Sequence, residues 1–292
     1  MVLSQIIANG IIIGSIYALV AVGFSLIYST NKFMYFAQGV SVVIASYFLL
    51  YFYKDLGLNL LISIVLVLVL STLFGYLNNK LVYTPLQKRK TSNIILLIAS
   101  IAILILFENI IVILFGSSVK TINIPFLSQT LQIFGATLTV LQCIIIIVSI
   151  ILLILLYLFM NFTKIGRNLR AVADNKELSE IAGINSNKIV SISFILGSFI
   201  AGIAGILIAL EQTLEPTIGT TLIIKGFTGA IIGGITSVPA SIIGSYFLGL
   251  VENIGVYFLS ASYRDAIAFV LLFIFLLFRP NGLFGINKGV KK

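Results

Sequence analysis

Long stretches without a charged residue are the feature that most limits how this chain can fold. A helix needs roughly 20 apolar residues to cross a bilayer. Five uncharged stretches reach that scale, at 5–29, 34–53, 58–79, 138–162 and 189–210. Only 9% of the 292 residues are charged, against about 25% in soluble domains, which is too little polarity to cover a water-facing surface. The sequence therefore predicts an all-α, polytopic transmembrane bundle that occupies 1–292 as a single domain in a lipid bilayer.

Three further apolar segments are interrupted or short. The run 92–115 is interrupted only by Glu108, and the run 266–278 ends at Arg279-Pro280-Asn281-Gly282, where proline stops a helix and Asn-Gly turns the chain. The region 221–259 is long enough for two passes but is broken at Gly233-Gly234 and Pro239. Two full passes there would make nine spans and a re-entrant half-helix would make fewer, so we expect about eight to nine. The stretch from 116 to 135 is expected to be an external loop.

Basic residues gather in alternate gaps between the apolar runs. Because Lys and Arg mark the cytoplasmic side of a membrane, this alternation predicts a cytoplasmic carboxyl terminus and an external amino terminus in an inner (plasma) membrane. The excess of 18 basic over 9 acidic residues is thus interpreted as a topology signal rather than a nucleic-acid patch. The first apolar run lacks the positive region of a signal peptide and is expected to remain as a helix. The basic gaps and tail contain Lys80, Lys88, Arg89 and Lys90, then Lys164, Arg167, Arg170, Lys176 and Lys188, and finally Lys288, Lys291 and Lys292.

The composition argues against catalysis. The chain has no histidine, which is the commonest general base and metal ligand, and its single cysteine, Cys143, lies in an apolar run. It has no GxxxxGK[ST] phosphate-binding loop, so neither a metal nor ATP is expected as its own cofactor. A membrane-embedded enzyme would have only Glu, Asp and Lys as acids and bases. Energy for any transport must therefore come from a partner or an ion gradient.

One polar segment, 164–188, is long enough to carry structure on the cytoplasmic side. Leu169, Val172 and Ala173 follow the spacing of one helix face. Asp174 and Glu177 have the spacing of a capping box that opens a second helix, and Gly183 falls where a helix ends in the left-handed conformation. The pattern predicts two short amphipathic helices at the membrane face, whose apolar residues enter a partner's groove. A solvated connecting loop is the alternative.

The residues of this segment also carry a family resemblance. The order from Glu177 to Gly183, ELSEIAG, resembles the degenerate EAAxxxG coupling motif of ABC-transporter permeases, and the whole chain resembles the LivH-type permeases of branched-chain amino acid importers. Departures occur at Gln38 and Val40, where that family usually has His and Glu, and at Thr236 and Ser241, which replace glycines. The matching pieces include Asn9-Gly10, Gly14-Ser15, Tyr17-Ala18-Leu19, Phe36-Ala37-Gln38-Gly39, Ile165-Gly166-Arg167, Gly183-Ile184-Asn185, Lys225-Gly226-Phe227, Ser237-Val238-Pro239, Tyr263-Arg264-Asp265 and the segment from Arg279 to Gly285.

The resemblance implies a set of partners. It implies a homologous second permease, two cytoplasmic ATPases that bind the ATP, and an extracytoplasmic binding protein that delivers an aliphatic, branched-chain amino acid. Related permeases carry urea, short amides or simple sugars, and no residue of this sequence decides among these substrates. The resemblance places the ATPase contact in 164–188, with Arg167, Arg170, Asp174 and Glu177 as a polar rim and Leu169, Val172, Ile181 and Ile184 as anchors. Gly166, Ala171, Ala182 and Gly183 complete the predicted contact.

Ionisable residues inside membrane spans are expensive to bury and are candidates for function. Lys225 and Glu252 lie on neighbouring passes of the broken region, so an ion pair between them is plausible, either as a structural pair or as part of a translocation path. An ion-coupled secondary transporter, with Glu108 or Glu252 as its proton or sodium site, is the rival function. The candidate path residues are Gln38, Glu108, Asn109, Lys225, Gly233, Gly234 and Glu252.

Overall fold

The chain folds into a bundle of membrane-length helices. The computed structural model describes residues 2–133 and 135–284. Among them, seven helices are long and apolar enough to cross a membrane. These are α1 (Val2–Asn31), α3 (Leu60–Asn78) continued through a π-helical turn (Asn79–Tyr83) into α4 (Thr84–Lys88), α5 (Asn93–Phe115), α6 (Val140–Phe162), α9 (Ser186–Glu211), α11 (Val238–Phe258) and α12 (Arg264–Phe278), which a short 3-10 turn (Ala261–Tyr263) precedes.

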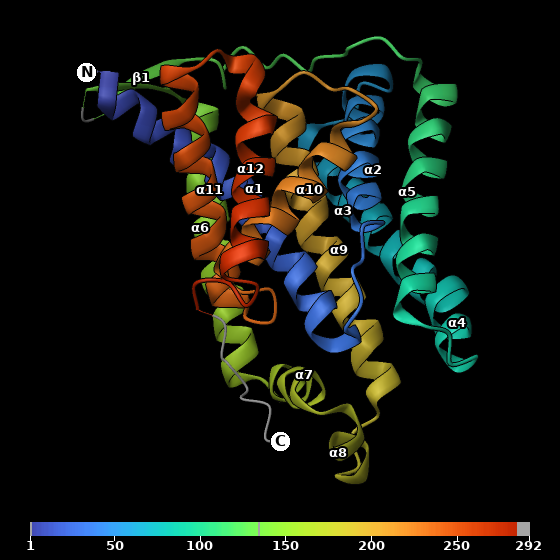
Figure 1. The fold of residues 1–292 in the computed structure, drawn as a ribbon. Coiled ribbons are helices and arrows are strands. Elements are labelled where there is room, and N and C mark those ends of the chain that lie inside the picture. Colours follow the sequence, from blue (N-terminus) through green and yellow to red (C-terminus); the bar gives the residue numbers. More distant parts are fainter. Residues whose placement is uncertain (1, 134, 285–292) are drawn as a thin grey trace.

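Two shorter helices stand beside the seven. These are α2 (Gln38–Leu50), which continues as a π-helical turn (Tyr51–Asp55), and α10 (Ile218–Gly233). Consecutive helices run in opposite directions between the end where α1 begins and the end where α7 lies (Figure 1). The described residues thus contain seven helices of membrane-spanning length, fewer than the eight to nine predicted, because α2 and α10 are shorter.

The predicted break in 221–259 separates two antiparallel helices. Gly234 has a φ of +135° and ends α10, a conformation that favours glycine. Pro239 lies in the first turn of α11, where its missing N–H costs nothing, so it starts this helix rather than breaking one. The segment is therefore two helices joined by a tight turn, of which α11 has membrane-spanning length and α10, with 16 residues, is shorter.

The core of the bundle surrounds α1. This helix packs against α9, α10 and α11, while α2 packs against α9 and α10. The packing is close because glycines meet across the interfaces: a side chain at Gly249 would overlap the backbone of Gly10 and Gly14. Lipid tails are as apolar as leucine, so tight packing of small residues replaces the hydrophobic drive that holds soluble helices together.

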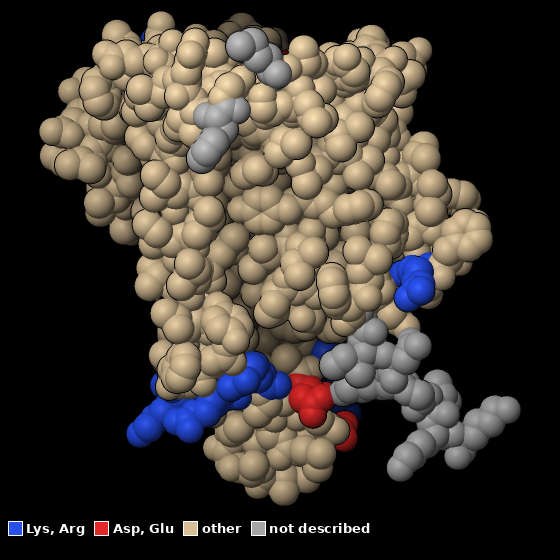
Figure 2. Space-filling model, turned by 90° about the vertical axis from the view of Figure 1, so that its left-hand side faces the viewer, with Lys and Arg blue, Asp and Glu red and all other residues tan. Residues whose placement is uncertain are grey.

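The outer helices face lipid. On α3, α5, α6 and α12 large apolar side chains are exposed, among them Val65, Ile98, Ile154 and Phe273. The face in Figure 2 is largely free of charge in its upper and middle parts, and Lys and Arg gather at the end where α7 lies. This distribution is that of a multi-pass membrane protein, with its basic side at the α7 end.

Short elements close the two ends of the bundle. At the α1 end, β1 (Thr130–Ile133) and β2 (Ala136–Thr139) pair as an antiparallel hairpin with Thr130 opposite Thr139. The Gln5 side chain accepts a hydrogen bond from the Thr137 N–H over 2.8 Å. The segment expected to be an external loop thus contains a strand, β1, because β2 directly after it supplies its backbone partners. At the opposite end lie α7 (Lys164–Asp174) and α8 (Lys176–Ile181) (Figure 1).

Candidate functional site

The segment α7–α8 forms the two short helices that the sequence predicts. Thr163 caps α7 by accepting a hydrogen bond from the Gly166 N–H over 3.0 Å. Gly166 lies so close to the backbone of Phe159 and Met160 at the end of α6 that a side chain there would overlap it. This contact turns the chain sharply from α6 into α7 and sets α7 across the end of the bundle (Figure 1).

The apolar stripe of α7 faces the protein itself. Leu169 and Val172 are buried and form a small cluster with Ile189 of α9. Ile184 packs against the same cluster and is partly buried. The prediction that Leu169 and Val172 are anchors for a partner is therefore wrong, because α7 uses this stripe to bind the ends of α6 and α9. Ala171 is partly buried on the same helix.

Asn175, and not Asp174, opens α8. Its side-chain oxygen accepts a hydrogen bond from the Leu178 N–H over 3.1 Å. Asp174 is the last residue of α7. The predicted capping box of Asp174 with Glu177 is therefore wrong, and the cap lies one residue later, at Asn175. Asn175 has an extended backbone, with φ of −149° and ψ of 110°, and this is the conformation an N-cap requires.

The apolar side chains that α8 presents outward are Leu178 and Ile181. Leu178 is 62% exposed and Ile181 is 83% exposed, although neither lies in the lipid-facing part of the bundle. Gly183 has a φ of +83°, which confirms the predicted left-handed end of the helix. The space beside its Cα is open. Ala182 is exposed beside it, and the charged side chains of Arg167, Arg170, Asp174 and Glu177 are exposed on α7 and α8.

A polar hollow of about 470 Å³ lies beside this surface. It is bounded by the end of α1 at Asn31, by Gln87 of α4 and by Asn175 and Glu177 of α8. The Gln87 side chain donates to the Asn31 side chain over 3.2 Å, which fixes one wall of the hollow. The α7 end of the molecule therefore combines the exposed Leu178 and Ile181 with exposed charged side chains and a recess.

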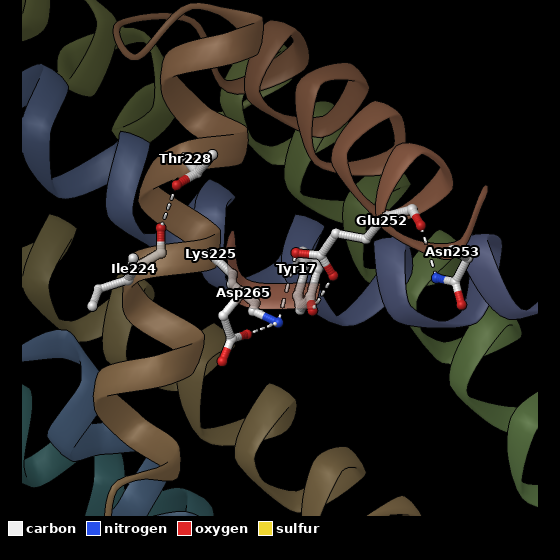
Figure 3. Close-up of polar contacts among 8 residues, drawn as sticks. Tyr17, Ile224, Lys225, Thr228, Glu252, Asn253 and Asp265 are labelled. Atoms are coloured by element: carbon white, nitrogen blue, oxygen red, sulfur yellow. Dashed lines mark hydrogen bonds and ion pairs between the residues drawn. The ribbon is translucent and has the colours of Figure 1, made fainter. Parts of the chain in front are cut away.

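A second candidate site is a largely buried cluster of three charged side chains and one tyrosine, contributed by four helices. The Lys225 ammonium of α10 lies 3.6 Å from the Glu252 carboxylate of α11 and 2.8 Å from the Asp265 carboxylate of α12. Tyr17 of α1 donates its hydroxyl to Glu252 over 2.9 Å, and the ammonium lies 5.5 Å from the Tyr17 ring centroid. Figure 3 shows these side chains converging. The predicted pair of Lys225 and Glu252 is confirmed.

Sequence reasoning missed Tyr17 and Asp265 as members of this cluster. Both belong to motifs noted for the family resemblance, but nothing in their local sequence places them beside Lys225. Glu252 is fully buried and Lys225 is 6% exposed, whereas the Asp265 side chain is 62% exposed. A buried charge needs partners of this kind, and Asp265 is the member of the cluster that reaches solvent or lipid headgroups.

The remaining candidate path residues have separate sets of contacts. Glu108 accepts hydrogen bonds from the N–H of Thr220 over 3.2 Å and from its hydroxyl over 2.6 Å, which ties α5 to the start of α10. Asn109 is exposed, and its side chain donates to the Ile105 carbonyl of its own helix. Gln38 is fully buried and donates to the Val20 carbonyl over 3.3 Å. These three residues do not join the Lys225 cluster.

Gly233 and Gly234 take part in a cap that the sequence did not indicate. A side chain at Gly233 would overlap the carbonyl of Ala240. The N–H groups of Leu283 and Phe284 donate to the carbonyls of Ile232 and Gly233 over 2.8 and 3.0 Å. The segment after α12 thus satisfies carbonyls at the end of α10, which would otherwise lack partners. The turn at Asn281-Gly282, with φ of +75° at Gly282, brings it there.

The charged clusters offer no site for a metal ion. Among residues 2–133 and 135–284, no group of three or more His, Cys, Asp or Glu side chains is placed to hold a metal. The acidic side chains of the Lys225 cluster are instead engaged by an ammonium and a phenol. This chemistry suits ion pairing and polar contacts rather than catalysis.

Comparison with known proteins places these features in context. A profile of the family described as "Branched-chain amino acid transport system / permease component" matches residues 6–276. The chain is 31% identical over 296 residues to the high-affinity branched-chain amino acid transport system permease protein BraD of Pseudomonas aeruginosa, covering 96% of this chain and 95% of that protein. It is 30% identical over 290 residues to the corresponding permease protein LivH of Escherichia coli K12, covering 95% and 94%.

A solved structure shares the fold. PsaBC from Streptococcus pneumoniae in complex with Fab superposes with a TM-score of 0.51 at 16% identity and covers 94% of this chain and 91% of that one. At this identity the likeness concerns the arrangement of the helices alone.

Proposed function

The chain belongs to the permease family of branched-chain amino acid transport systems, and on this premise we propose that it carries branched-chain amino acids inward, driven by ATPases that bind α8. As an ABC-type permease it is a transporter component and not an enzyme. The proposed complex contains a homologous second permease, two cytoplasmic ATPases and an extracytoplasmic binding protein. In this complex α7, α8 and the carboxyl terminus face the cytoplasm, and α1 begins outside.

The exposure of Leu178 and Ile181 is the observation that supports ATPase docking. Both side chains project from a helix at the basic end of the molecule, with 62% and 83% of their surface exposed. Large apolar side chains on a polar, water-facing helix are typical of a helix that enters a partner's groove. The buried Leu169 and Val172 hold α7 against α6 and α9. A movement of α8 is therefore transmitted through α7 to these two membrane helices.

Paired substitutions of these side chains test the docking proposal. We expect Leu178→Asp with Ile181→Asp to leave membrane insertion intact, because neither side chain is packed inside the chain. Co-purification of the ATPases, uptake of labelled leucine and uptake-linked ATP hydrolysis should all fall at least tenfold. Phe126→Asp, which changes a 64% exposed apolar residue at the opposite end, is the matched control. Normal ATPase binding and uptake in the double variant would rule out α8 as the contact.

The substrate and the energy source need their own measurements. We expect isoleucine and valine, but not urea or ribose, to compete with leucine for uptake. Uptake should stop when the ATPases are absent. Uptake that persists without them would instead support an ion-coupled transporter that uses Glu108 or Glu252.

The polar residues at membrane depth belong to the same proposal. We propose that Lys225 and Glu252, with the more exposed Asp265, form the polar wall of the path near the end where α12 begins. An ammonium and two carboxylates there match the opposite charges of an amino acid's carboxylate and amine. Gln38 and Glu108 are further candidates on separate walls.

A further inference from the structure

An apolar groove runs along the outer side of the bundle between α3 and α9. Its volume is about 470 Å³, and its walls include Val65, Val69, Leu73 and Tyr76 of α3 and Ile195 and Phe199 of α9. The hydroxyl of Thr72 in the wall donates to the Leu68 carbonyl over 2.6 Å, so it presents no unsatisfied polar group. Only an apolar occupant would match this lining.

The length of the groove fits one half of a bilayer. From Val65 to Tyr76 the helix rises about 16 Å at roughly 1.5 Å per residue. The hydrocarbon core of a bilayer is about 30 Å thick, so one leaflet occupies about 15 Å. Ile195 and Phe199 lie nine and thirteen residues after Ser186, where α9 begins at the α7 end (Figure 1), so the groove lies at mid-depth of the bundle. An acyl chain that enters from the α7 end would therefore occupy the groove with its middle and distal carbons.

Two lysines lie beyond the end of the groove that faces the α7 side. Lys80 follows Tyr76 by four residues, and its ammonium lies 5.7 Å from the Tyr76 ring centroid. Lys188 precedes Ile195 by seven residues, so it lies on the same face of α9, two turns closer to the α7 end. Asn79, which precedes Lys80, donates to Ser191 over 2.9 Å and joins the two helices. Both lysines are exposed, and residues 56–107 contain no Asp or Glu.

From this arrangement we propose that the groove is a binding site for an anionic phospholipid, with one acyl chain between α3 and α9 and its phosphate between Lys80 and Lys188. A phospholipid supplies the apolar chain and the negative charge together. Basic residues at the end of intramembrane grooves attract anionic headgroups in this way.

Lipid binding is measured on the full chain assembled with its partner subunits in nanodiscs. The probe is phosphatidylglycerol in a phosphatidylcholine background, and native mass spectrometry counts the lipid that stays bound. We expect preferential retention of phosphatidylglycerol. Lys80→Gln and Lys188→Gln should each reduce the preference about fivefold, without disturbing the fold because both side chains are exposed. Leu73→Trp, which fills the groove, should abolish retention, whereas Ile98→Trp on the lipid-facing side of α5 should not.

A photo-crosslinker distinguishes the possible occupants and does not depend on transport. With p-benzoyl-phenylalanine in place of Val69, which is 58% exposed, the proposal expects an adduct with the mass of a phospholipid. A protein adduct would identify the groove as a permease interface and overturn the proposal. Equal retention of phosphatidylglycerol in Leu73→Trp and Ile98→Trp would overturn it as well. Loss of uptake in these variants with lipid binding unchanged would bear on the transport proposal alone.

Discussion

Each charged side chain of the Lys225 cluster is bound by residues from other helices. Glu252 is fully buried, and its charge is compensated by the ammonium of Lys225 and the hydroxyl of Tyr17. Removing one partner of a buried pair leaves an uncompensated charge at a cost of about 3–5 kcal/mol. The cluster therefore stabilises the junction of α1, α10, α11 and α12, whatever part it takes in transport.

Exchanging the two charges separates stability from transport. Lys225→Glu should reduce the amount of folded protein in the membrane strongly, because it puts a carboxylate beside Glu252. The exchange of Lys225→Glu with Glu252→Lys should restore part of that amount. If these residues also line the path, uptake should stay low in the exchanged variant at equal abundance. Fluorescence-detected size-exclusion chromatography and labelled leucine uptake measure the two quantities.

The exchanged variant has a matched control in Asp265→Asn. This change removes a charge from a side chain that is 62% exposed, so abundance should fall less than in Lys225→Glu. Failure of the exchange to restore any folded protein would contradict the pairing.

Gly233 is a second position that controls the packing, because any side chain added there would overlap a neighbouring helix. We expect Gly233→Ala to destabilise the protein by about 1–3 kcal/mol, the usual cost of overpacking, because the added methyl group would overlap the Ala240 carbonyl. Thermal unfolding in detergent measures the loss. Gly116→Ala is the control: it adds the same methyl group where φ is +83° and no neighbour is near, so only backbone strain is expected. Equal melting temperatures for Gly233→Ala and the wild type would contradict the close contact.

Among the elements, α8 depends most on local interactions. It has six residues, far fewer than an isolated helix needs for stability, and Asn175 supplies its N-terminal cap. Ser179 adds a hydrogen bond from its hydroxyl to the Asn175 carbonyl over 2.8 Å. One asparagine therefore organises the start of the helix that we propose to contact the ATPases.

Removal of this cap should loosen α8 alone. We expect Asn175→Ala to cost about 1 kcal/mol, as for other N-caps, and to speed amide hydrogen exchange of 176–182 several-fold while α7 stays protected. Hydrogen–deuterium exchange with mass spectrometry makes the measurement. Lys176→Ala, at the neighbouring exposed position, should leave the exchange unchanged. Equal exchange in the two variants would argue that α8 is held by other contacts.

For the whole molecule, the orientation in the membrane is the property on which the proposed function depends most. The chain has one cysteine, Cys143, so Cys143→Ser provides a background for labelling. In intact, right-side-out membrane vesicles an impermeant maleimide should label Ser118→Cys and should label Lys176→Cys only after permeabilisation. Both positions are exposed and lie at opposite ends of the bundle. Labelling of Lys176→Cys in sealed vesicles would place α8 outside and exclude its contact with cytoplasmic ATPases.

The membrane-spanning architecture follows from the sequence by itself. Backbone groups in lipid must find partners within their own segment, so long apolar runs have to become helices. The sequence also sufficed to predict the helix ends at Gly183 and Gly233-Gly234, because these ends need the left-handed or open conformations that glycine adopts. The pair of Lys225 and Glu252 was predictable because their helices are consecutive and a buried charge needs an opposite one.

Only the tertiary structure decided which face of each helix meets which neighbour. A helix that is apolar all round carries no signal for its rotation, so the convergence of Tyr17 and Asp265 on Lys225 could not be foreseen. The same holds for Leu169 and Val172: their spacing predicts an apolar stripe, but only the position of α6 and α9 shows that the stripe faces inward. In lipid the hydrophobic effect selects helices without selecting their contacts, and close packing and polar pairing make that selection.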